Sequence, residues 1–457
     1  MSSAEMRAAE AAALARGITA EALMDEAGAG VAETVRRFLP TPGRCIAFIG
    51  KGHNGGDAIV AAEHLRTHGW EVELRCAFEE SAGAELTRKK RQAFDGGRGL
   101  SARIIGLKRL PGLATIWALR PLPPSTTAVL DGLLGLGAKP PLREPVRAAC
   151  REINELRRSA NARVFAVDLP SGLEGDCGEA DPDCVVADCT VAIGFAKRGL
   201  LADRALDFVG RLEVIPLRAL QVEAMPNHPF TSTAENLHQL LPRRHFGAYK
   251  NQFGRIGIVA GSEGLTGAAI LCACGALRAG AGLVELFVPR TIYPIVAAAA
   301  PPEAMVKPID SYRDLLQTEA DVWAIGPGLG RTHADEIFEL VEKLESPAVI
   351  DADALNIIAG DPDVLNRCAG PRLLTPHPGE MKRLFRQATD SREQTARDFC
   401  SRYGVALLLK GSRTIVSQRD ESLSYNTTGT PAMATGGMGD VLTGVCAALI
   451  GQKLSPY

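Results

Sequence analysis

The stretch TGGMGDVLTG, residues 435–444, places three glycines around the start of an apolar run that has helical spacing. This pattern predicts a glycine-rich loop leading into a helix N-terminus, where unpaired N–H groups and the helix dipole favour phosphate. Asp440 follows the last of these glycines, and a carboxylate there could accept a proton from an attacking hydroxyl group. The stretch therefore indicates chemistry on a phosphorylated substrate. The alternative interpretation is a glycine-rich turn capped by an aspartate.

The overall composition indicates a globular protein with two domains. The chain has 457 residues, which is more than one ordinary core accommodates, and 46% of them are hydrophobic. Its 51 basic and 53 acidic side chains leave a net charge of −2. Electrostatics therefore gives no reason to expect nucleic acid or a membrane surface as a partner.

Neither a targeting signal nor a disulfide framework is indicated. Residues 1–17 have the pattern of an amphipathic helix instead of a signal peptide. The apolar stretch 268–289 is interrupted by Arg278 and Glu285, which argues against a membrane span. The 11 cysteines are scattered without a CxxC pair, so we expect reduced, mostly buried thiols in a cytoplasmic protein.

Two series of short β-rich runs, separated by helical stretches, predict parallel sheets that helices bury on both faces. The first series comprises RCIAFIG (44–50), VELRCA (72–77), TAVLDG (127–132), RVFAVDLPSG (163–172) and CTVAIGF (189–195). The second comprises RIGIVAGS (255–262), LVELFVP (283–289), VWAIGPGLG (322–330), AVIDADAL (348–355), RLLTPHPGE (372–380) and ALLLKGSRTIV (406–416). The segment 218–237 has no clear period, so we place the boundary near residue 222 and expect domains of residues 1–222 and 223–457.

Polar side chains gather at strand ends in the first series, where open α/β sheets bind ligands. The loop GKGHNGGD (50–57) follows one strand and opens a helix, but it matches neither standard nucleotide motif. Oxygen groups from Asn54, Asp131 and Ser171 could together hold a hard cation. Ordinary helix caps and turn residues are the alternative for each of them.

The motifs NGGD (54–57), DGLLGLG (131–137) and DLPSG (168–172) resemble the NAD(P)H-hydrate epimerase domain, as does the segment 17–33. The resemblance implies a Rossmann-like three-layer α/β/α sandwich. It also implies a potassium ion bound by Asn54, Asp131 and Ser171, and acid–base work by Asp168 during epimerisation. The hydrated nicotinamide cofactor would contact Asp168 together with His53, Asn54, Gly55, Gly56, Asp57, Gly135, Leu136, Gly137, Ala138, Lys139, Pro140 and Pro141. Two positions depart from the family pattern, namely His53 for a usual Asn and Ala58 for a frequent Gly.

The second series carries its own set of strand-end motifs. Glycines surround the turn at 254–267, and the small residues that follow permit close packing or ligand approach. His377 lies between two prolines that would fix its direction, although a structural role is the alternative. Lys410 at a strand end could meet a phosphate as a point charge, and a salt bridge at the sheet edge is the alternative.

The order AGS…TGAA, GPGLG, DADAL, TPHPGE, KGS and GGMGDVLTG resembles the ADP- or ATP-dependent NAD(P)H-hydrate dehydratase, a ribokinase-like fold. The resemblance implies hydrate contacts at Ala268, Gly328, His377 and Asp440. It implies nucleotide contacts at Lys410, Gly411, Ser412, Arg413 and Thr414, and at Gly436, Gly437, Met438 and Gly439 within the loop 431–440. Met438 replaces a frequent Thr, but an anion hole needs only its backbone N–H. The family fold continues beyond the position of Tyr457, about 17 residues past Asp440, so we expect a domain that is incomplete at its end.

Together the two resemblances imply repair of hydrated nicotinamide cofactors by a bifunctional epimerase and dehydratase. Asp440 would take the proton from the C6 hydroxyl of the S-hydrate, whose oxygen would attack the terminal phosphate of the nucleotide. ADP is the expected donor over ATP, with magnesium and potassium as further cofactors. The expected partners are these small molecules and other copies of the chain in a homo-oligomer, without nucleic acid or membrane. The alternative is a ribokinase-like kinase of a vitamin precursor with a non-catalytic N-terminal binding or scaffold domain.

Overall fold

The computed structural model describes residues 1–457 except 97–102, 107–126, 221–227, 239, 242 and 457. The chain forms two compact units, Met1–Glu223 and Ala224–Tyr457. The domain boundary that we predicted near residue 222 lies in 221–227, outside the described residues. Both units are α/β, and each is described by itself below.

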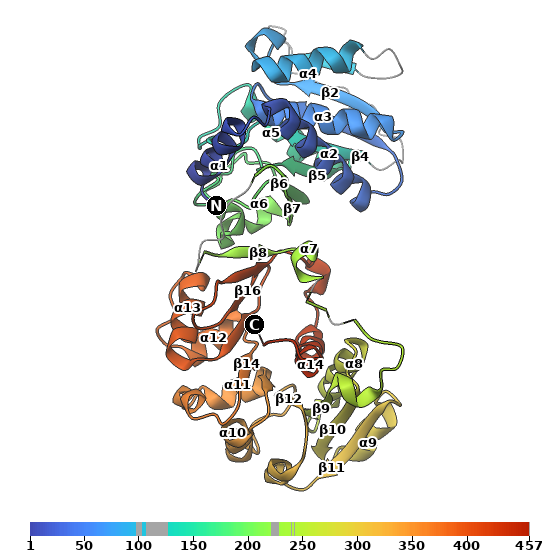
Figure 1. The fold of residues 1–457 in the computed structure, drawn as a ribbon, viewed down its shortest axis with the longest axis vertical. Helices are drawn as coiled ribbons and strands as arrows, with labels where there is room; N and C mark the ends of the chain where they lie inside the picture. Colours follow the sequence, from blue (N-terminus) through green and yellow to red (C-terminus); the bar gives the residue numbers. More distant parts are fainter. Residues whose placement is uncertain (97–102, 107–126, 221–227, 239, 242, 457) are drawn as a thin grey trace. The chain divides into compact units, whose positions relative to one another are not determined.

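The first unit is built on a seven-stranded sheet with the order β3-β2-β1-β4-β5-β6-β7 (Figure 1). Every neighbouring pair is parallel, as the buried apolar runs predict. The strands are β1 (Arg44–Ile49), β2 (Glu71–Cys76), β3 (Arg103–Gly106), β4 (Thr127–Gly132), β5 (Arg163–Val167), β6 (Cys189–Ile193) and β7 (Arg211–Ile215). The order reverses between β1 and β4, which creates the crevice where such sheets bind ligands.

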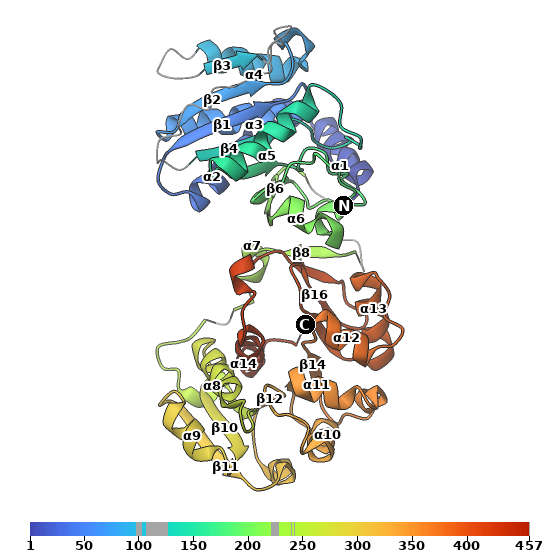
Figure 2. The same ribbon diagram turned by 180° about the vertical axis from the view of Figure 1, so that it is seen from behind.

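Helices cover both faces of this sheet (Figure 2). On one face, α1 (Ser3–Ala15), α2 (Ala20–Phe38) and α3 (His53–Thr67) bury the side chains of Cys45, Ala47 and Ile49 in β1. On the other face, α5 (Val146–Ser159) packs over Ile46 and Phe48 of the same strand. This alternation is the period of two that a strand buried on both faces requires. The unit also contains α4 (Glu85–Gly96), which packs beside α3, and α6 (Leu206–Val209).

The second unit contains a ten-stranded sheet with the order β11-β10-β9-β12-β13-β14-β15-β16-β17-β8. Its strands are β8 (Phe230–Ser232), β9 (Arg255–Val259), β10 (Leu283–Pro289), β11 (Ala304–Ile309), β12 (Val322–Ile325), β13 (Ala348–Ile350), β14 (Arg372–Leu374), β15 (Ala406–Leu409), β16 (Thr414–Ser417) and β17 (Ser424–Asn426). Strands from β11 to β15 pair in parallel, whereas β16 is antiparallel to both of its neighbours.

Some strands of the fold lack the pattern that predicts a strand, and two others were predicted as one. The run 406–416, predicted as one strand of the series, forms β15 and β16 as an antiparallel pair because residues 410–413 turn between them. Strands β3, β7, β8, β11 and β17 were not predicted. In β11 the side chains alternate between partly buried and exposed, so this edge strand lacks the continuous apolar run used as the criterion.

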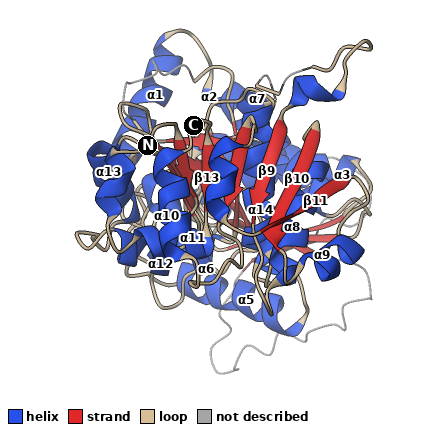
Figure 3. Ribbon diagram, turned by 90° about the horizontal axis from the view of Figure 1, so that it is seen from below, coloured by secondary structure: helices blue, strands red, loops and turns tan. Residues whose placement is uncertain are grey.

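Two groups of helices sandwich the second sheet (Figures 1 and 3). One face carries α8 (Thr266–Arg278), α9 (Tyr293–Ala299) and α14 (Met438–Gly451), and the other carries α10 (Ala334–Lys343), α11 (Ala352–Ile358), α12 (Pro378–Leu384) and α13 (Arg392–Tyr403), while α7 (Ala234–Leu237) follows β8. The small residues of α8 allow it to pack closely on α14. A Cβ atom on Gly275 would lie 2.2 Å from the carbonyl oxygen of Val441, and one on Gly444 would lie 2.0 Å from that of Cys272.

The cysteines are all free, and eight of the 11 are buried, in agreement with the expected thiols. Within the described residues, none of the helices combines the length and the apolar character that a membrane crossing requires.

Candidate functional site

The predicted residues of the first unit converge at the carboxyl ends of its central strands. Residues 50–57 follow β1, Asp131 lies near the end of β4, and Asp168 directly follows β5. Because these strands are parallel neighbours, residues far apart in the sequence meet at one edge. Loop 135–141, predicted to contact substrate, is half-buried to exposed and is therefore open to a ligand.

Glycines allow the loops after β1 and β4 to touch. A Cβ atom on Gly55 would lie 2.4 Å from the carbonyl oxygen of Gly50, so only glycine fits this position at the start of α3. A Cβ atom on Gly135 would lie 3.1 Å from Cβ of Asn54, which places the two loops in contact. The departure at Ala58 fits as well, because its methyl group lies opposite Gly132, where an added Cβ would be only 2.3 Å away.

The three residues predicted to bind a cation form one cluster. Ser171 donates to Asp131 twice, from Oγ to Oδ1 at 2.7 Å and from its backbone N–H to Oδ2 at 2.8 Å. Asn54 joins them through Leu134, because its Nδ2 donates to the Leu134 carbonyl at 2.7 Å while the Leu134 N–H donates to Ser171 Oγ at 3.0 Å. The sequence-based prediction thus named residues that the fold does bring together.

Two features of this cluster fit a cation. Asn54 Oδ1 is buried and has no hydrogen-bond partner in the described part of the chain. Asp131 is fully buried, and the groups that donate to its carboxylate are neutral. Burial raises the pKa of Asp131 to about 6, although the hydrogen bonds from Ser171 and Leu133 act in the opposite direction. An unpartnered amide oxygen beside a buried carboxylate is the donor set that a hard monovalent cation would satisfy.

Asp168 is held by a lysine that the sequence analysis did not select. Lys197 follows β6, its side chain is 0% exposed, and its ammonium group forms a short ion pair with Asp168 Oδ1. The same oxygen accepts from the Ile193 N–H at 3.0 Å, and Lys197 also donates to the Ile193 carbonyl at 2.8 Å. Asp168 has φ +66°, a conformation that costs free energy in a residue other than glycine. A lysine after a strand is ordinarily a surface residue, so no sequence pattern distinguished Lys197.

The charges of this pair act on two further carboxyl groups. Burial raises the pKa of Asp57 well above its ordinary value, and the charges of Asp168 and Glu10 raise it further. Burial likewise raises the pKa of Glu10, with Asp168 as the next cause, whereas Lys197 and His53 lower it. Glu10 lies on α1 and was not predicted as a site residue. The first site therefore combines one buried lysine with three carboxyl groups, those of Asp168, Asp57 and Glu10.

In the second unit, the predicted hydrate contacts lie on adjacent loops. Gly328 follows β12 with φ +62°, and a Cβ atom there would lie 2.9 Å from the methyl group of Ala268 in the first turn of α8. The loop after β12 and the start of α8 are thus in contact. Glycine is required at residue 328 both by its backbone conformation and by this approach.

The stretch 435–444 forms the predicted helix start. Gly437 caps α14 with φ +85°, and Asp440 lies in the first turn, half-buried. Burial is the main cause that raises the pKa of Asp440, and the charge of Asp351 adds to it, while Lys410 opposes both. A carboxylate whose pKa is raised binds a proton more readily, which suits a general base.

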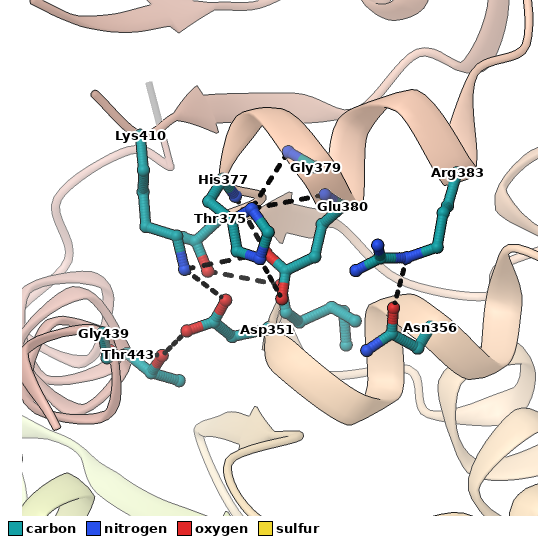
Figure 4. A network of polar contacts seen from close by, with 11 residues as sticks. Asp351, Asn356, Thr375, His377, Gly379, Glu380, Arg383, Lys410, Gly439 and Thr443 are labelled. Carbon is teal, nitrogen blue, oxygen red and sulfur yellow. Dashed lines mark hydrogen bonds and ion pairs between the residues drawn. The ribbon is translucent and has the colours of Figure 1, made fainter. Parts of the chain in front are cut away.

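Lys410 is engaged by acidic partners (Figure 4). Its Nζ lies 2.8 Å from Asp351 Oδ1 and 3.9 Å from Glu380 Oε2. The salt bridge that we held open as an alternative is therefore present. Neither Asp351 nor Glu380 was predicted as a site residue, although both stand in the quoted motifs DADAL and TPHPGE.

His377 has a fixed orientation for a reason beyond its flanking prolines. It is the N-cap of α12, and its Nδ1 accepts from the N–H groups of Gly379 at 3.0 Å and Glu380 at 3.4 Å (Figure 4). Because Nδ1 accepts from backbone donors, the neutral ring carries its proton on Nε2. The ring is exposed, and its Nε2 lies 3.5 Å from Glu380 Oε1, a distance too long for a strong hydrogen bond, so this N–H can still serve a ligand.

The predicted nucleotide loop 410–414 is the turn between β15 and β16. Gly411 and Ser412 are exposed, and Thr414 Oγ1 donates to the Gly411 carbonyl at 3.0 Å. Arg413 is only 4% exposed, and its carbonyl accepts from Arg392 at 2.7 Å. The open surface of this turn is thus provided by its glycine and serine more than by the arginine.

Family models and curated relatives match both halves of the chain. Residues 20–199 match the family described as YjeF-related protein N-terminus, and residues 256–457 match the family described as NAD(P)H-hydrate dehydratase. The bifunctional NAD(P)H-hydrate repair enzyme Nnr of Moorella thermoacetica is 38% identical over 95% of this chain and 84% of its own length. The enzyme of the same name from Escherichia coli is 35% identical over 96% of this chain and 82% of its own.

A solved structure is also similar to about half of this chain. It is an ADP/ATP-dependent NAD(P)H-hydrate dehydratase from Bacillus subtilis that was co-crystallised with ATP and magnesium. It is 29% identical, covers 51% of this chain and 84% of its own, and has a TM-score of 0.45.

Proposed function

The chain belongs to the family of bifunctional NAD(P)H-hydrate repair enzymes, and we propose that its two units carry out successive steps of this repair. The first unit interconverts the R and S forms of the hydrate, and the second unit dehydrates the S form to NAD(P)H at the expense of a nucleotide. The observation that carries this proposal is the identity of 38% with a bifunctional relative over 95% of the chain. Both units also keep polar strand-end residues that a scaffold would not need.

In the second unit, Asp440 is the general base. It accepts the proton of the C6 hydroxyl, and the hydroxyl oxygen then attacks the terminal phosphorus of ADP or ATP, whose bond to the bridging oxygen breaks and releases AMP or ADP. The N–H groups of residues 436–439 at the start of α14 stabilise the negative charge that develops on this phosphate. The C6–O bond then breaks with release of phosphate, a proton leaves C5, and the ring double bond is restored.

The remaining contacts follow from the positions of the loops. The hydrate would lie against Ala268 and Gly328, with His377 offering its Nε2–H. The nucleotide would lie along residues 410–414 and the glycines of 436–439. Magnesium would arrive on the phosphate oxygens, where it neutralises charge, since it keeps several waters and needs few protein ligands.

In the first unit, Asp168 is the proposed acid–base group beside residues 53–57 and 135–141. Potassium would be held by Asn54 Oδ1, Asp131 and Ser171. Its positive charge would balance the buried Asp131 carboxylate, whose hydrogen-bond donors are neutral. His53 is exposed at the first turn of α3 and can donate to a ligand as the usual Asn would. The homo-oligomeric state and the cytoplasmic location stay predictions.

The test is recovery of absorbance at 340 nm from mixed R- and S-NADH-hydrate with ADP or ATP, magnesium and potassium. Full recovery at a rate proportional to enzyme, with stoichiometric release of phosphate, supports both activities. A stable phosphorylated product without recovered absorbance would instead identify a small-molecule kinase. Recovery limited to the S fraction would leave the first unit without its proposed activity.

Potassium should stabilise the first unit through Asp131. At 100 times its dissociation constant, a ligand adds about 2.7 kcal/mol, which corresponds to roughly 5–10 °C in the thermal midpoint of a domain of this size. Asp131→Asn keeps the shape of the side chain but removes its charge, so we expect the stabilisation by KCl over NaCl to disappear. Pulse proteolysis during heating, with first-unit peptides identified by mass spectrometry, measures this midpoint.

The matched control is Asp188→Asn, the same change near the amino end of β6. Asp188 accepts from the Val164 N–H at 2.9 Å and from Arg157 at 3.0 Å, away from the proposed cation ligands. This variant should lower the midpoint in both salts but keep the difference between them. A potassium effect that survives in Asp131→Asn would contradict the site.

A further inference from the structure

Asp351 occupies a helix N-cap position but does not cap the helix. It lies between β13 and α11, a position where an aspartate ordinarily accepts from the N–H groups of the first turn. Its side chain makes no such bond. The next residue, Ala352, has φ +49°, a conformation that alanine adopts only at a cost. The start of α11 thus lacks a side-chain cap and contains an alanine in an unfavourable backbone conformation. The Asp351 carboxylate forms its hydrogen bonds with other elements instead.

Both oxygens of the Asp351 carboxylate contact other elements (Figure 4). Oδ1 accepts from Lys410 Nζ at 2.8 Å, at the end of β15, and Oδ2 accepts from Thr443 Oγ1 at 2.7 Å, in the second turn of α14. Asp351 is 1% exposed and Thr443 is 0% exposed. Because Asp351 and Thr443 are buried, the hydrogen bond between them is stronger than its equivalent at the surface, and the bond from Lys410 is charge-assisted as well.

These contacts lie directly beneath the glycine-rich start of α14. Thr443 Oγ1 also lies 3.1 Å from the carbonyl oxygen of Gly439. A Cβ atom on Gly439 would lie 3.5 Å from Lys410 Nζ and 3.7 Å from Asp351 Oδ2. Gly439, the residue before Asp440, therefore packs against the Asp351–Lys410 ion pair.

We propose that Asp351 is a positioning residue for dehydration, which holds Lys410 and the first turns of α14, where Asp440 lies, in one arrangement. The proposal rests on the function proposed above. Lys410 has three N–H donors and gives one of them to Asp351, so the others can still face a phosphate. Asp351 thus fixes where the positive charge of Lys410 is presented.

The charge of Asp351 also raises the pKa of the neighbouring Asp440. The pKa of Asp440 is raised by burial first, then by Asp351, and to a lesser extent by Asp353, while Lys410 lowers it. Buried Cys272, on the facing helix α8, has its own pKa raised by burial first and then by Asp440. A general base acts in its ionised form, so a raised pKa moves the acid limb of the activity profile to higher pH. Removal of the Asp351 charge must move that limb to lower pH.

The test compares Asp351→Asn with Thr443→Val across a pH profile of kcat/KM for ADP at saturating S-hydrate. We expect Asp351→Asn to lose about 10- to 100-fold in kcat, the effect of a buried charge-assisted hydrogen bond. Its acid limb should move to lower pH, because the charge of Asp351 raises the pKa of Asp440. Thr443→Val removes a hydroxyl but no charge, so it should lower kcat without moving the limb.

Lys410→Met provides an independent check if Asp351→Asn does not fold. It removes the charge that lowers the pKa of Asp440, so its acid limb should move to higher pH, opposite to Asp351→Asn. Asp321→Asn is the matched control, because exposed Asp321 accepts from the Arg255 N–H at 2.7 Å at the amino end of the same sheet. This control should keep the kcat and the acid limb of the unaltered enzyme.

The outcomes separate this inference from the proposed function. If the unaltered chain dehydrates S-hydrate and Asp351→Asn shows the same kcat and the same acid limb, Asp351 is not a positioning residue. A lower kcat with an unmoved limb in both Asp351→Asn and Lys410→Met would also overturn it, since only packing would then be involved. If the unaltered chain releases no phosphate from ADP with S-hydrate, the proposed function itself fails.

Discussion

Asp440→Asn should abolish dehydration while leaving nucleotide binding intact. Asparagine keeps the size of the side chain but cannot accept the proton of the C6 hydroxyl, and general bases contribute about 10²- to 10⁴-fold to a rate. The glycines and N–H groups that surround the phosphate belong to the backbone of 436–439, so the affinity for ADP should change little. The rate of phosphate release with S-NADH-hydrate and the dissociation constant of ADP measured by calorimetry together test this.

The two-unit chain supplies its own control for this variant. Epimerisation depends on the first unit, so Asp440→Asn should interconvert the R- and S-hydrates at the unaltered rate, as chromatography would show. Turnover equal to that of the unaltered enzyme would remove Asp440 from the role of base. Loss of ADP binding as well would mean that the variant has disturbed the start of α14, and the catalytic role would then be tested with Asp440→Glu.

Substitution of Asp168 should eliminate use of the R-hydrate, for a reason that involves Lys197. Asp168→Asn removes the proposed acid–base group and also leaves a fully buried ammonium group without its carboxylate. Breaking a buried ion pair on one side destabilises a protein by about 3–5 kcal/mol. Loss of activity in Asp168→Asn by itself would therefore not distinguish the loss of a catalytic group from the loss of folded protein.

The double variant Asp168→Asn/Lys197→Met separates these two effects. It removes both charges, so the first unit should regain much of the stability lost in Asp168→Asn, whereas R-hydrate consumption should stay at the spontaneous rate. Conversion of S-hydrate by the second unit provides the internal reference. Consumption of R-hydrate at the unaltered rate, after correction for spontaneous epimerisation, would refute the role of Asp168.

Local sequence was sufficient for the features that depend on the nearest residues. The parallel strands β1, β4, β9 and β10 are mostly apolar runs, and burial on both faces requires such runs. The glycine-rich loops could also be predicted from local sequence. A positive φ, as at Gly328 and Gly437, favours glycine at that position, so the residue type itself indicates the turn. The edge strand β11 was missed since one side of it faces water and its pattern weakens accordingly.

The charged residues that surround the two candidate sites could not be predicted from local sequence. Lys197, Glu10, Asp351 and Glu380 resemble ordinary surface residues in the sequence, and three of them are buried in the fold. Lys197 meets Asp168 because β6 lies beside β5, and Lys410 meets Asp351 because β15 and β13 lie on either side of β14.

The sequence by itself determined the α/β class, the glycine-rich loops and the identity of Asp168 and Asp440 as candidate catalytic groups. Only the tertiary structure decided which charges neutralise, orient or raise the pKa of those groups. The physical reason is that backbone conformation and burial periodicity are set within a few residues along the chain. Electrostatic interactions instead depend on distance in space, and the order of the strands in each sheet sets that distance.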